Sequence, residues 1–304
     1  MKQVAVAVAT LWSAPELTRA SDAAALRDEP DIGAWIATMT VSERTGSDVV
    51  TQLLLGDPVL VEEVRPDGWA RVVAPGQPAP GLDPRGYPGW MRAAQLASPV
   101  AGDGAPLVVD AVRTDLAVSP GGPVALPGVV LGTHLTPAGQ AVGGWQPVRA
   151  PGHTSVLWAR AADLAPVPSA PPTGTELLAV ARRLRGAVYV WGGLSTLGID
   201  CSGLVHLACR RLGLLVPRDA HEQAASATPV PAGTERPGDL YFFARPGRRV
   251  HHVGIVAAPA EGTAPSRMLH ASSSHGVVEE PMPPERAETL TTAATVGAAA
   301  VPRT

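Results

Sequence analysis

The stretch IDCSGLVHLACRR, residues 199–211, contains both cysteines of the chain, Cys201 and Cys209. In this stretch and directly after it, apolar residues recur at helical spacing: Leu204, Val205, Leu207, Ala208 and Leu212. With Gly213 as a typical residue just past a helix end, we expect a helix over residues 202–212 that begins beside Cys201. The two cysteines would then lie about 12 Å apart along the helix axis, beyond the roughly 7 Å that a disulfide spans.

The two cysteines differ in their expected chemistry. They form no CxxC pair and the chain has no other cysteine, so a zinc site is not indicated. Cys209 lies among apolar helix residues, where a free cysteine usually packs as a small hydrophobe. Cys201 lies at the expected helix N-terminus, where unpaired N–H groups favour a thiolate and lower its pKa. Gly203 leaves space beside it, so its position suits a nucleophile and a packing residue about equally.

Three histidines on expected strands are the candidates for a general base. Alternation places His252 on the same face as Gly254, and this glycine leaves room for a nucleophile beside the ring. His270 follows on the next strand, where a second polar ring can orient the first. A metal site is the alternative, but the adjacent His251 points to the opposite face from His252. We expect structural or surface roles for the other five of the eight histidines: His134, His153, His206, His221 and His275.

Composition limits the class of protein. The 304 residues carry a net charge of −3 and no basic block, which argues against nucleic-acid binding. No segment approaches the roughly 20 apolar residues of a membrane span. The N-terminal run Val4–Leu11 reads as a strand of the fold and not as a signal peptide. With only two cysteines, these features favour a cytoplasmic protein. A secreted protein remains the alternative if translation starts upstream.

The chain divides into three blocks at Pro-rich segments. GWMRAAQL (residues 89–96) resembles LWARAADL (residues 157–164), which indicates a divergent repeat of two small β-barrels. After the linker Ala165–Gly174, a helix over Thr175–Arg185, capped by Thr175, precedes the cysteine helix. Three strands are expected next, which makes this last block α+β: Asp239–Ala244, His251–Ala258 and Arg267–Ser273. We expect domains over residues 1–100, 101–168 and 169–304.

An ordered set of motifs resembles one family. YVWGG, GIDCSGLV, PRDA, RPGDLYFF, HHVGIV and MLHAS, over about Thr175–Ala300, resemble the NlpC/P60 cysteine peptidases, which have a papain-like fold. The first two blocks resemble bacterial SH3-type domains. The stretches VATLWSAPE, TQLLLGDPV and RGYPGW resemble the three-domain members, which are γ-D-glutamyl-L-diamino acid endopeptidases. The implied fold is two SH3-like barrels followed by an α+β papain-like domain.

The resemblance implies residue roles. Cys201 would be the nucleophile, His252 the base and His270 the orienting third residue, while the Tyr189 hydroxyl would assist the oxyanion site. Four residues would line substrate subsites: Asp200, Ser202, Asp219 and Ala220. Tyr87 would close one end of the groove. In the three-domain members an acid on the first barrel pairs with the substrate amine. Gln52 falls near that place and is not acidic, and three acids are nearby: Asp48, Asp57 and Glu62.

The resemblance also implies a function. The protein would be a monomer that needs no metal or organic cofactor. It would hydrolyse the γ-D-glutamyl-L-diamino acid bond of peptidoglycan stem peptides, as free muropeptides in murein recycling. One alternative is an exported hydrolase of intact cell wall. Another, from a different class, is a non-catalytic peptidoglycan-binding module, which the joint presence of Cys201, His252 and His270 argues against.

Overall fold

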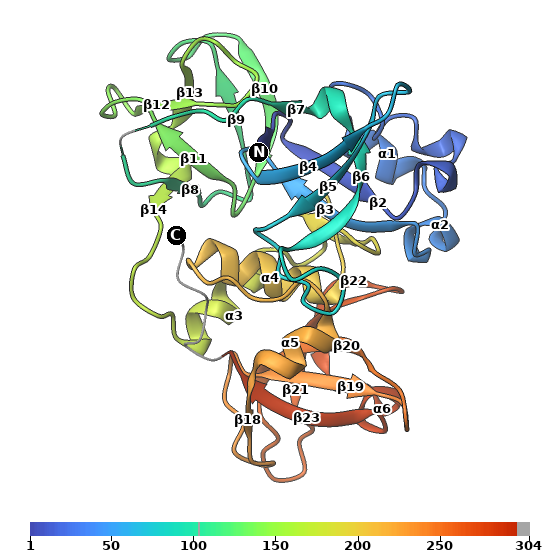
Figure 1. The fold of residues 1–304 in the computed structure, drawn as a ribbon. Coiled ribbons are helices and arrows are strands. Elements are labelled where there is room, and N and C mark those ends of the chain that lie inside the picture. The colour runs from blue at the N-terminus through green and yellow to red at the C-terminus, as the bar shows by residue number, and fades with distance from the viewer. Residues whose placement is uncertain (103, 297–304) are drawn as a thin grey trace.

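The protein is described by a computed structural model that covers residues 1–102 and 104–296. The ends of the expected third domain and of the family resemblance, at residues 304 and 300, lie outside the described residues. Two β regions lie side by side above an α+β region, with helix α4 (Cys201–Arg211) where the three meet (Figure 1).

The two β regions have the same topology. The first has strands β1 (Lys2–Val4), β2 (Val8–Trp12), β3 (Val49–Leu54), β4 (Pro58–Val64), β5 (Trp69–Ala74), β6 (Tyr87–Arg92) and β7 (Leu96–Ala97). The second has strands β8 (Leu107–Val109), β9 (Arg113–Ala117), β10 (Val124–Val130), β11 (His134–Pro137), β12 (Trp145–Arg149), β13 (Leu157–Arg160) and β14 (Leu164–Pro166). Their strand orders, β3-β2-β6-β5-β4-β1-β7 and β10-β9-β13-β12-β11-β8-β14, correspond strand for strand. The repeat predicted from GWMRAAQL and LWARAADL is therefore confirmed.

The N-terminal run forms two strands, so the single strand expected over Val4–Leu11 is wrong. The chain changes partners within it: β1 pairs with β4 and β7, whereas β2 pairs with β3 and β6. Between β2 and β3 the first region also carries short helices that sequence patterns did not reveal: η1 (Pro15–Leu17), η2 (Ala20–Asp22), α1 (Ile32–Thr38) and α2 (Val41–Thr45). Trp35 of α1 is fully buried and its indole N–H donates to Asp22.

The third region places three helices before an antiparallel sheet, as expected, and a fourth between the last two strands in chain order. Its helices are α3 (Gly174–Arg182), α4, α5 (Ala220–Ser226) and α6 (Pro284–Ala287), and a small sheet joins β15 (Val188–Tyr189), β17 (Gly198–Ile199) and β16 (Leu194–Ser195). The main sheet runs in the order β18 (Thr228–Val230), β23 (Leu290–Thr295), β19 (Leu240–Ala244), β20 (Val250–Ala258), β21 (Arg267–Ser272), β22 (Gly276–Pro281). Helix α3 is capped by Thr173 and not by Thr175, because Thr173 forms a capping box with Glu176.

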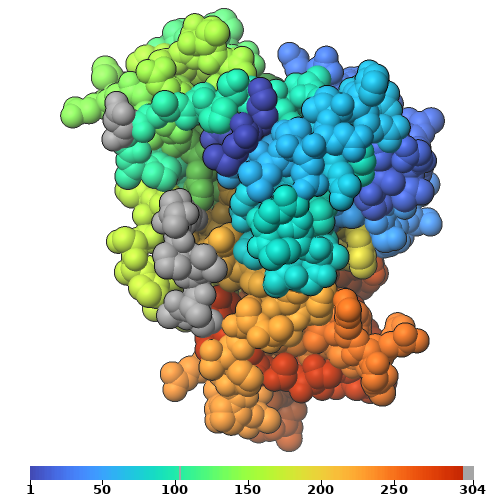
Figure 2. Space-filling view, viewed as in Figure 1, coloured from blue at the N-terminus to red at the C-terminus, as the bar shows by residue number. Residues whose placement is uncertain are grey.

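Helix α4 is buried almost all round. Every residue from Cys201 to Arg210 is buried, although the helix carries His206 and Arg210. The helix packs against α3 and the main sheet, and one hydrophobic cluster continues from α4 into both β regions through residues such as Trp35 and Leu131. The space-filling view shows the first β region lying directly against the third (Figure 2). The element with the candidate nucleophile is thus held by all three parts of the fold.

Candidate active site

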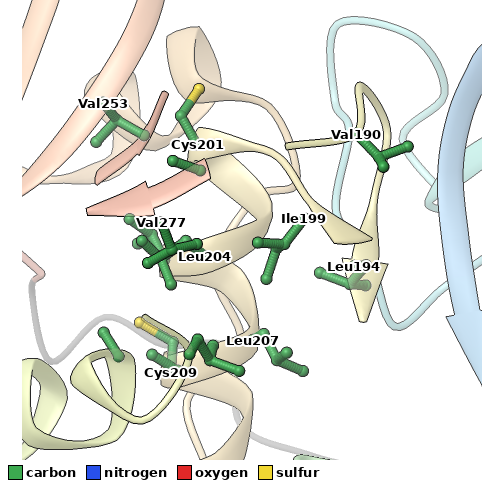
Figure 3. Close-up of a cluster of buried hydrophobic side chains, with 14 of the residues drawn as sticks. Val190, Leu194, Ile199, Cys201, Leu204, Leu207, Cys209, Val253 and Val277 are labelled. Atoms are coloured by element: carbon green, nitrogen blue, oxygen red, sulfur yellow. The ribbon is translucent and has the colours of Figure 1, made fainter. Parts of the chain in front are cut away.

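The two cysteines lie at opposite ends of α4 (Figure 3). Both are free thiols. Cys209 is fully buried among leucine and alanine side chains, as its apolar surroundings in the sequence predicted. Cys201 is the first residue of the helix and 7% exposed, with Val253 of β20 beside it. The helix N-terminus expected at Cys201 is therefore confirmed, and Cys201 lies beside the sheet that carries the histidines.

Asp200 caps the cysteine helix, and both oxygens of its carboxylate accept several hydrogen bonds. Oδ1 accepts from the Gly203 backbone N–H at 2.6 Å, and Oδ2 accepts from the Gly192 N–H at 2.9 Å. The Arg218 guanidinium donates to both oxygens, at 3.0 and 2.8 Å. Ser202 donates its hydroxyl to Asp200 at 3.2 Å and accepts from Arg218 at 2.9 Å. The side chains of Asp200 and Ser202 are thus committed to one another, which leaves their backbone groups for any substrate contact.

Arg218 was missed by the sequence analysis, although it lies within the PRDA motif. It is 1% exposed, and its remaining N–H groups donate to the Thr51 hydroxyl of β3 and to the Gly193 carbonyl. One guanidinium therefore ties the N-terminus of the cysteine helix to the first β region. Arginine suits this place because its planar fork can serve several acceptors at once.

The Cys201 thiol ionises with difficulty on its own. Burial raises its pKa to about 12, and the neighbouring Asp200 charge acts in the same direction. The Val253 and Ser202 backbone N–H groups and Arg218 oppose this shift. The lowered pKa expected from the helix N-terminus is therefore wrong for the isolated thiol, because burial outweighs the N–H groups. A thiolate at this site requires a nearby base. Once the base has taken the proton, its positive charge pairs with the negative charge of the thiolate.

His252 and His270 form a buried pair on neighbouring strands. The His252 Nε2 and His270 Nδ1 atoms are 2.8 Å apart, and the rings meet edge to face. Burial is the main cause that lowers the pKa of both rings, and that of His252 falls well below its ordinary value. The structure thus brings together the two histidines that the strand pattern selected. His251 is exposed at the neighbouring position of the strand, near Arg286.

Two further partners complete this arrangement. The His270 Nε2 atom lies 2.9 Å from a carboxylate oxygen of Glu280 on β22, a contact that sequence reasoning missed. Tyr189 lies at the end of β15, where burial and the nearby Cys201 raise the pKa of its hydroxyl. The hydroxyl therefore stays protonated and can donate a hydrogen bond.

Tyr87 and Asp219 meet at the junction of the first β region with the third. The Tyr87 hydroxyl lies 3.3 Å from both carboxylate oxygens of Asp219, the residue that precedes α5. Burial raises the pKa of Asp219, while Arg218 opposes this shift. Ala220, the first residue of α5, is buried beside this pair. Backbone groups strengthen the junction, since the Gly81 N–H donates to Glu222 at 2.7 Å.

Three of the four residues near the expected amine-binding position of the first region have other partners. Gln52 is fully buried, and its side-chain oxygen accepts from the Leu194 N–H at 3.0 Å. Asp57 pairs with Arg210 of α4, and Glu62 pairs with Arg71 and Arg85 on the surface. Asp219 is thus the acid that the structure places beside Tyr87.

The described residues contain neither a metal-binding cluster nor a helix that could span a membrane. Residues 1–102 and 104–296 contain no group of three or more His, Cys, Asp or Glu side chains arranged to hold a metal ion. No helix in the same part of the chain is long and apolar enough to cross a membrane.

Comparisons with known proteins found similar sequences and a similar structure. The model of the NlpC/P60 family matches residues 186–295. The chain is 31% identical to the γ-D-glutamyl-L-lysine dipeptidyl-peptidase of Bacillus subtilis over 92% of each protein. It is 30% identical to the protein of the same name from Bacillus cereus, over 90% of this chain and 84% of that one. The crystal structure of an NlpC/P60 family protein from Bacillus cereus superposes with a TM-score of 0.84 and 27% identity, covering 97% of this chain and 99% of that one.

Proposed function

Because the chain belongs to the NlpC/P60 family of cysteine peptidases, we propose that it hydrolyses the γ-D-glutamyl-L-diamino acid bond of peptidoglycan stem peptides. Relatives that match nearly the whole chain are named γ-D-glutamyl-L-lysine dipeptidyl-peptidases, which supports this bond. We further propose that the substrates are free muropeptides and not the intact wall.

The contact between Tyr87 and Asp219 is the observation that carries the preference for free peptides. Together with the bond between Gly81 and Glu222, it closes the junction between the first β region and α5. A half-buried carboxylate at this junction favours a substrate that ends there with a cationic amine. A cross-linked wall polymer would have to continue past this point.

In the proposed mechanism, Cys201 and His252 form an ion pair of a thiolate and an imidazolium. His252 takes the proton of Cys201, and the resulting thiolate attacks the γ-carbonyl carbon of the D-glutamyl residue. The oxyanion is stabilised by the Cys201 backbone N–H, at the start of the helix, and by the Tyr189 hydroxyl. His252 then protonates the leaving amine, and water hydrolyses the acyl-enzyme.

A direct assay tests the proposal. The purified protein is incubated with L-Ala-γ-D-Glu-L-Lys, with the corresponding diaminopimelate peptide and, separately, with intact sacculi. We expect release of the diamino acid from the free peptides, loss of activity in Cys201→Ala, and retained activity in the matched variant Cys209→Ala. Activity that persists in Cys201→Ala would contradict the assignment of the nucleophile. Equal rates on sacculi and free peptides would contradict the preference for muropeptides.

A further inference from the structure

Glu280 lies at the end of a chain of hydrogen bonds that starts at the candidate base. It is on β22, directly opposite Met268 in the pairing with β21, and its side chain is 28% exposed. Its Oε1 atom is 2.9 Å from His270 Nε2, and His270 Nδ1 is 2.8 Å from His252 Nε2. No motif in the sequence pointed to Glu280, and the mechanism above does not use it.

The hydrogen-bonding capacity of these groups decides where the ring protons lie. A carboxylate can only accept, so His270 must donate from Nε2. In a neutral ring the other nitrogen is then an acceptor, so His270 Nδ1 accepts from His252 Nε2. The free nitrogen of His252 is then Nδ1, with its lone pair available to take a proton.

We propose that Glu280 is a positioning residue of the catalytic machinery: acting through His270, it holds His252 in the tautomer that accepts the Cys201 proton. The proposal rests on the peptidase function given above. In the step concerned, the S–H bond of Cys201 breaks and an N–H bond forms at His252 Nδ1. The products are a thiolate and an imidazolium, so no charge is created overall.

Most groups around the pair oppose a positive charge on either ring. Burial lowers the pKa of His252 and His270, and Arg286 acts in the same direction on both rings. Two other histidines add to this effect, His251 on His252 and His275 on His270. Glu280 raises the pKa of His270, through its hydrogen bond and its charge. Among the described residues it is the acid that faces this end of the pair, and it offsets the positive charge that His252 gains.

The chain offers a matched control on the same strand. The carboxylate of the adjacent Glu279 accepts from the partly exposed Arg182 guanidinium of α3, at 2.8 and 2.9 Å. Its side chain therefore lies away from the histidines. Glu279→Gln removes the same charge from the same strand and leaves the His252–His270 pair intact.

Alkylation by iodoacetamide tests the proposal without any peptide substrate. The rate of Cys201 alkylation, followed by mass spectrometry across pH, reports the fraction of thiolate. We expect the midpoint of this profile to rise by about one pH unit in Glu280→Gln, or about tenfold less thiolate below the midpoint. Glu279→Gln should keep the wild-type profile. Where the peptide is a substrate, kcat should fall about tenfold in Glu280→Gln with KM unchanged.

The outcomes separate this proposal from the proposed function. Coincident alkylation profiles for Glu280→Gln and Glu279→Gln would overturn the role of Glu280, whatever the peptide assay shows. A shifted profile together with no peptide hydrolysis by the wild type would support Glu280 and reject the proposed substrate.

A second measurement needs no variant of Glu280. In Cys201→Ala at mildly alkaline pH, the ¹⁵N chemical shifts of the imidazole rings report their tautomers. We expect the proton on Nε2 in both His252 and His270. A proton on Nδ1 of either ring would contradict the proposal.

Discussion

The two acidic residues near Cys201, Asp200 and Asp219, have different surroundings and suit different roles. Asp200 is 7% exposed and its carboxylate is occupied by Arg218 and backbone donors, so it holds the helix start in place. Asp219 is less buried and has only long contacts with the Tyr87 hydroxyl. Because an amine would form a shorter and charge-assisted bond, Asp219 is the better candidate for substrate recognition.

Replacement of Asp219 by asparagine tests this division. In Asp219→Asn we expect KM for peptides with a free N-terminal amine to rise about tenfold or more, because a charge-assisted bond of about 1.5–3 kcal/mol is lost. N-acetylated peptides, which lack the cation, should react at similar rates in both proteins. Steady-state kinetics on the paired peptides measures the effect. An equal loss on both peptides would show that Asp219 acts structurally.

His206, inside helix α4, makes the free energy of unfolding depend on pH. It is 1% exposed, and burial, with Arg218 and Arg210, lowers its pKa to about 3. In the unfolded chain a histidine titrates near pH 6.5, so between about pH 6.5 and 3 the unfolded state binds more protons. The contribution of the neutral ring to stability is therefore complete above that range and decreases as the pH falls, by up to about 1.4 kcal/mol per unit.

We therefore expect His206→Gln to lose less stability than the wild type between pH 7 and 5. Urea unfolding at the two pH values measures this difference, and His275→Gln, at an exposed position, controls for the replacement itself. Parallel losses in the wild type and His206→Gln would refute the prediction.

At the level of elements, the N-terminus of α4 depends on a residue that follows the helix. Arg218 reaches back to the cap residue Asp200 and outward to Thr51 of β3. A short helix with a buried acidic cap gains from such a cation, since an unpaired buried carboxylate costs several kcal/mol. The element that presents Cys201 is thus completed by contacts from two other segments.

Substitution of Arg218 by lysine tests this arrangement. Lysine keeps the charge but cannot reproduce the fork, so we expect Arg218→Lys to lose about 2–4 kcal/mol of unfolding free energy. We also expect kcat to fall, because Cys201 is no longer held at a fixed helix start. Arg65→Lys, in an exposed ion pair with Glu16, should leave both quantities unchanged. Wild-type melting of Arg218→Lys would contradict the prediction.

At the scale of the whole molecule, α4 contacts all three regions. Arg210 is 8% exposed, pairs with Asp57 of the first β region and donates to the Gly132 carbonyl of the second at 2.7 Å. The hydrophobic cluster around α4 likewise includes residues of all three regions. Loss of any one region would expose buried surface on the other two.

We therefore expect a single unfolding transition in differential scanning calorimetry. Arg210→Met leaves the Asp57 carboxylate buried without its cation and should cost about 3–5 kcal/mol. The matched variant Arg211→Met removes a cation whose partner, Asp110, is 37% exposed and keeps Arg183, so we expect less than about 1 kcal/mol. Separate transitions for the three regions in the wild type would refute this account.

The sequence by itself determined the features that depend on neighbours along the chain. Helical spacing separated Cys201 from Cys209, strand alternation selected His252, and repeated motifs predicted two β regions with one topology. These features follow from local patterns, and a short segment of sequence is enough to recognise such a pattern. Motif order further identified the family. The burial that raises the pKa of Cys201 was not visible in this way, because it depends on what packs over the helix.

Only the tertiary structure decided the partners of these residues. Tyr87 and Asp219 are 132 positions apart, and Arg218 and Thr51 are 167 apart. Glu280 is ten positions from His270, yet no local pattern distinguishes it from Glu279. Which of the two faces the histidines depends on the register of β21 with β22. Such contacts are decided by the packing of whole elements, because many residues of suitable chemistry compete for each partner and only the folded chain brings one of them within reach.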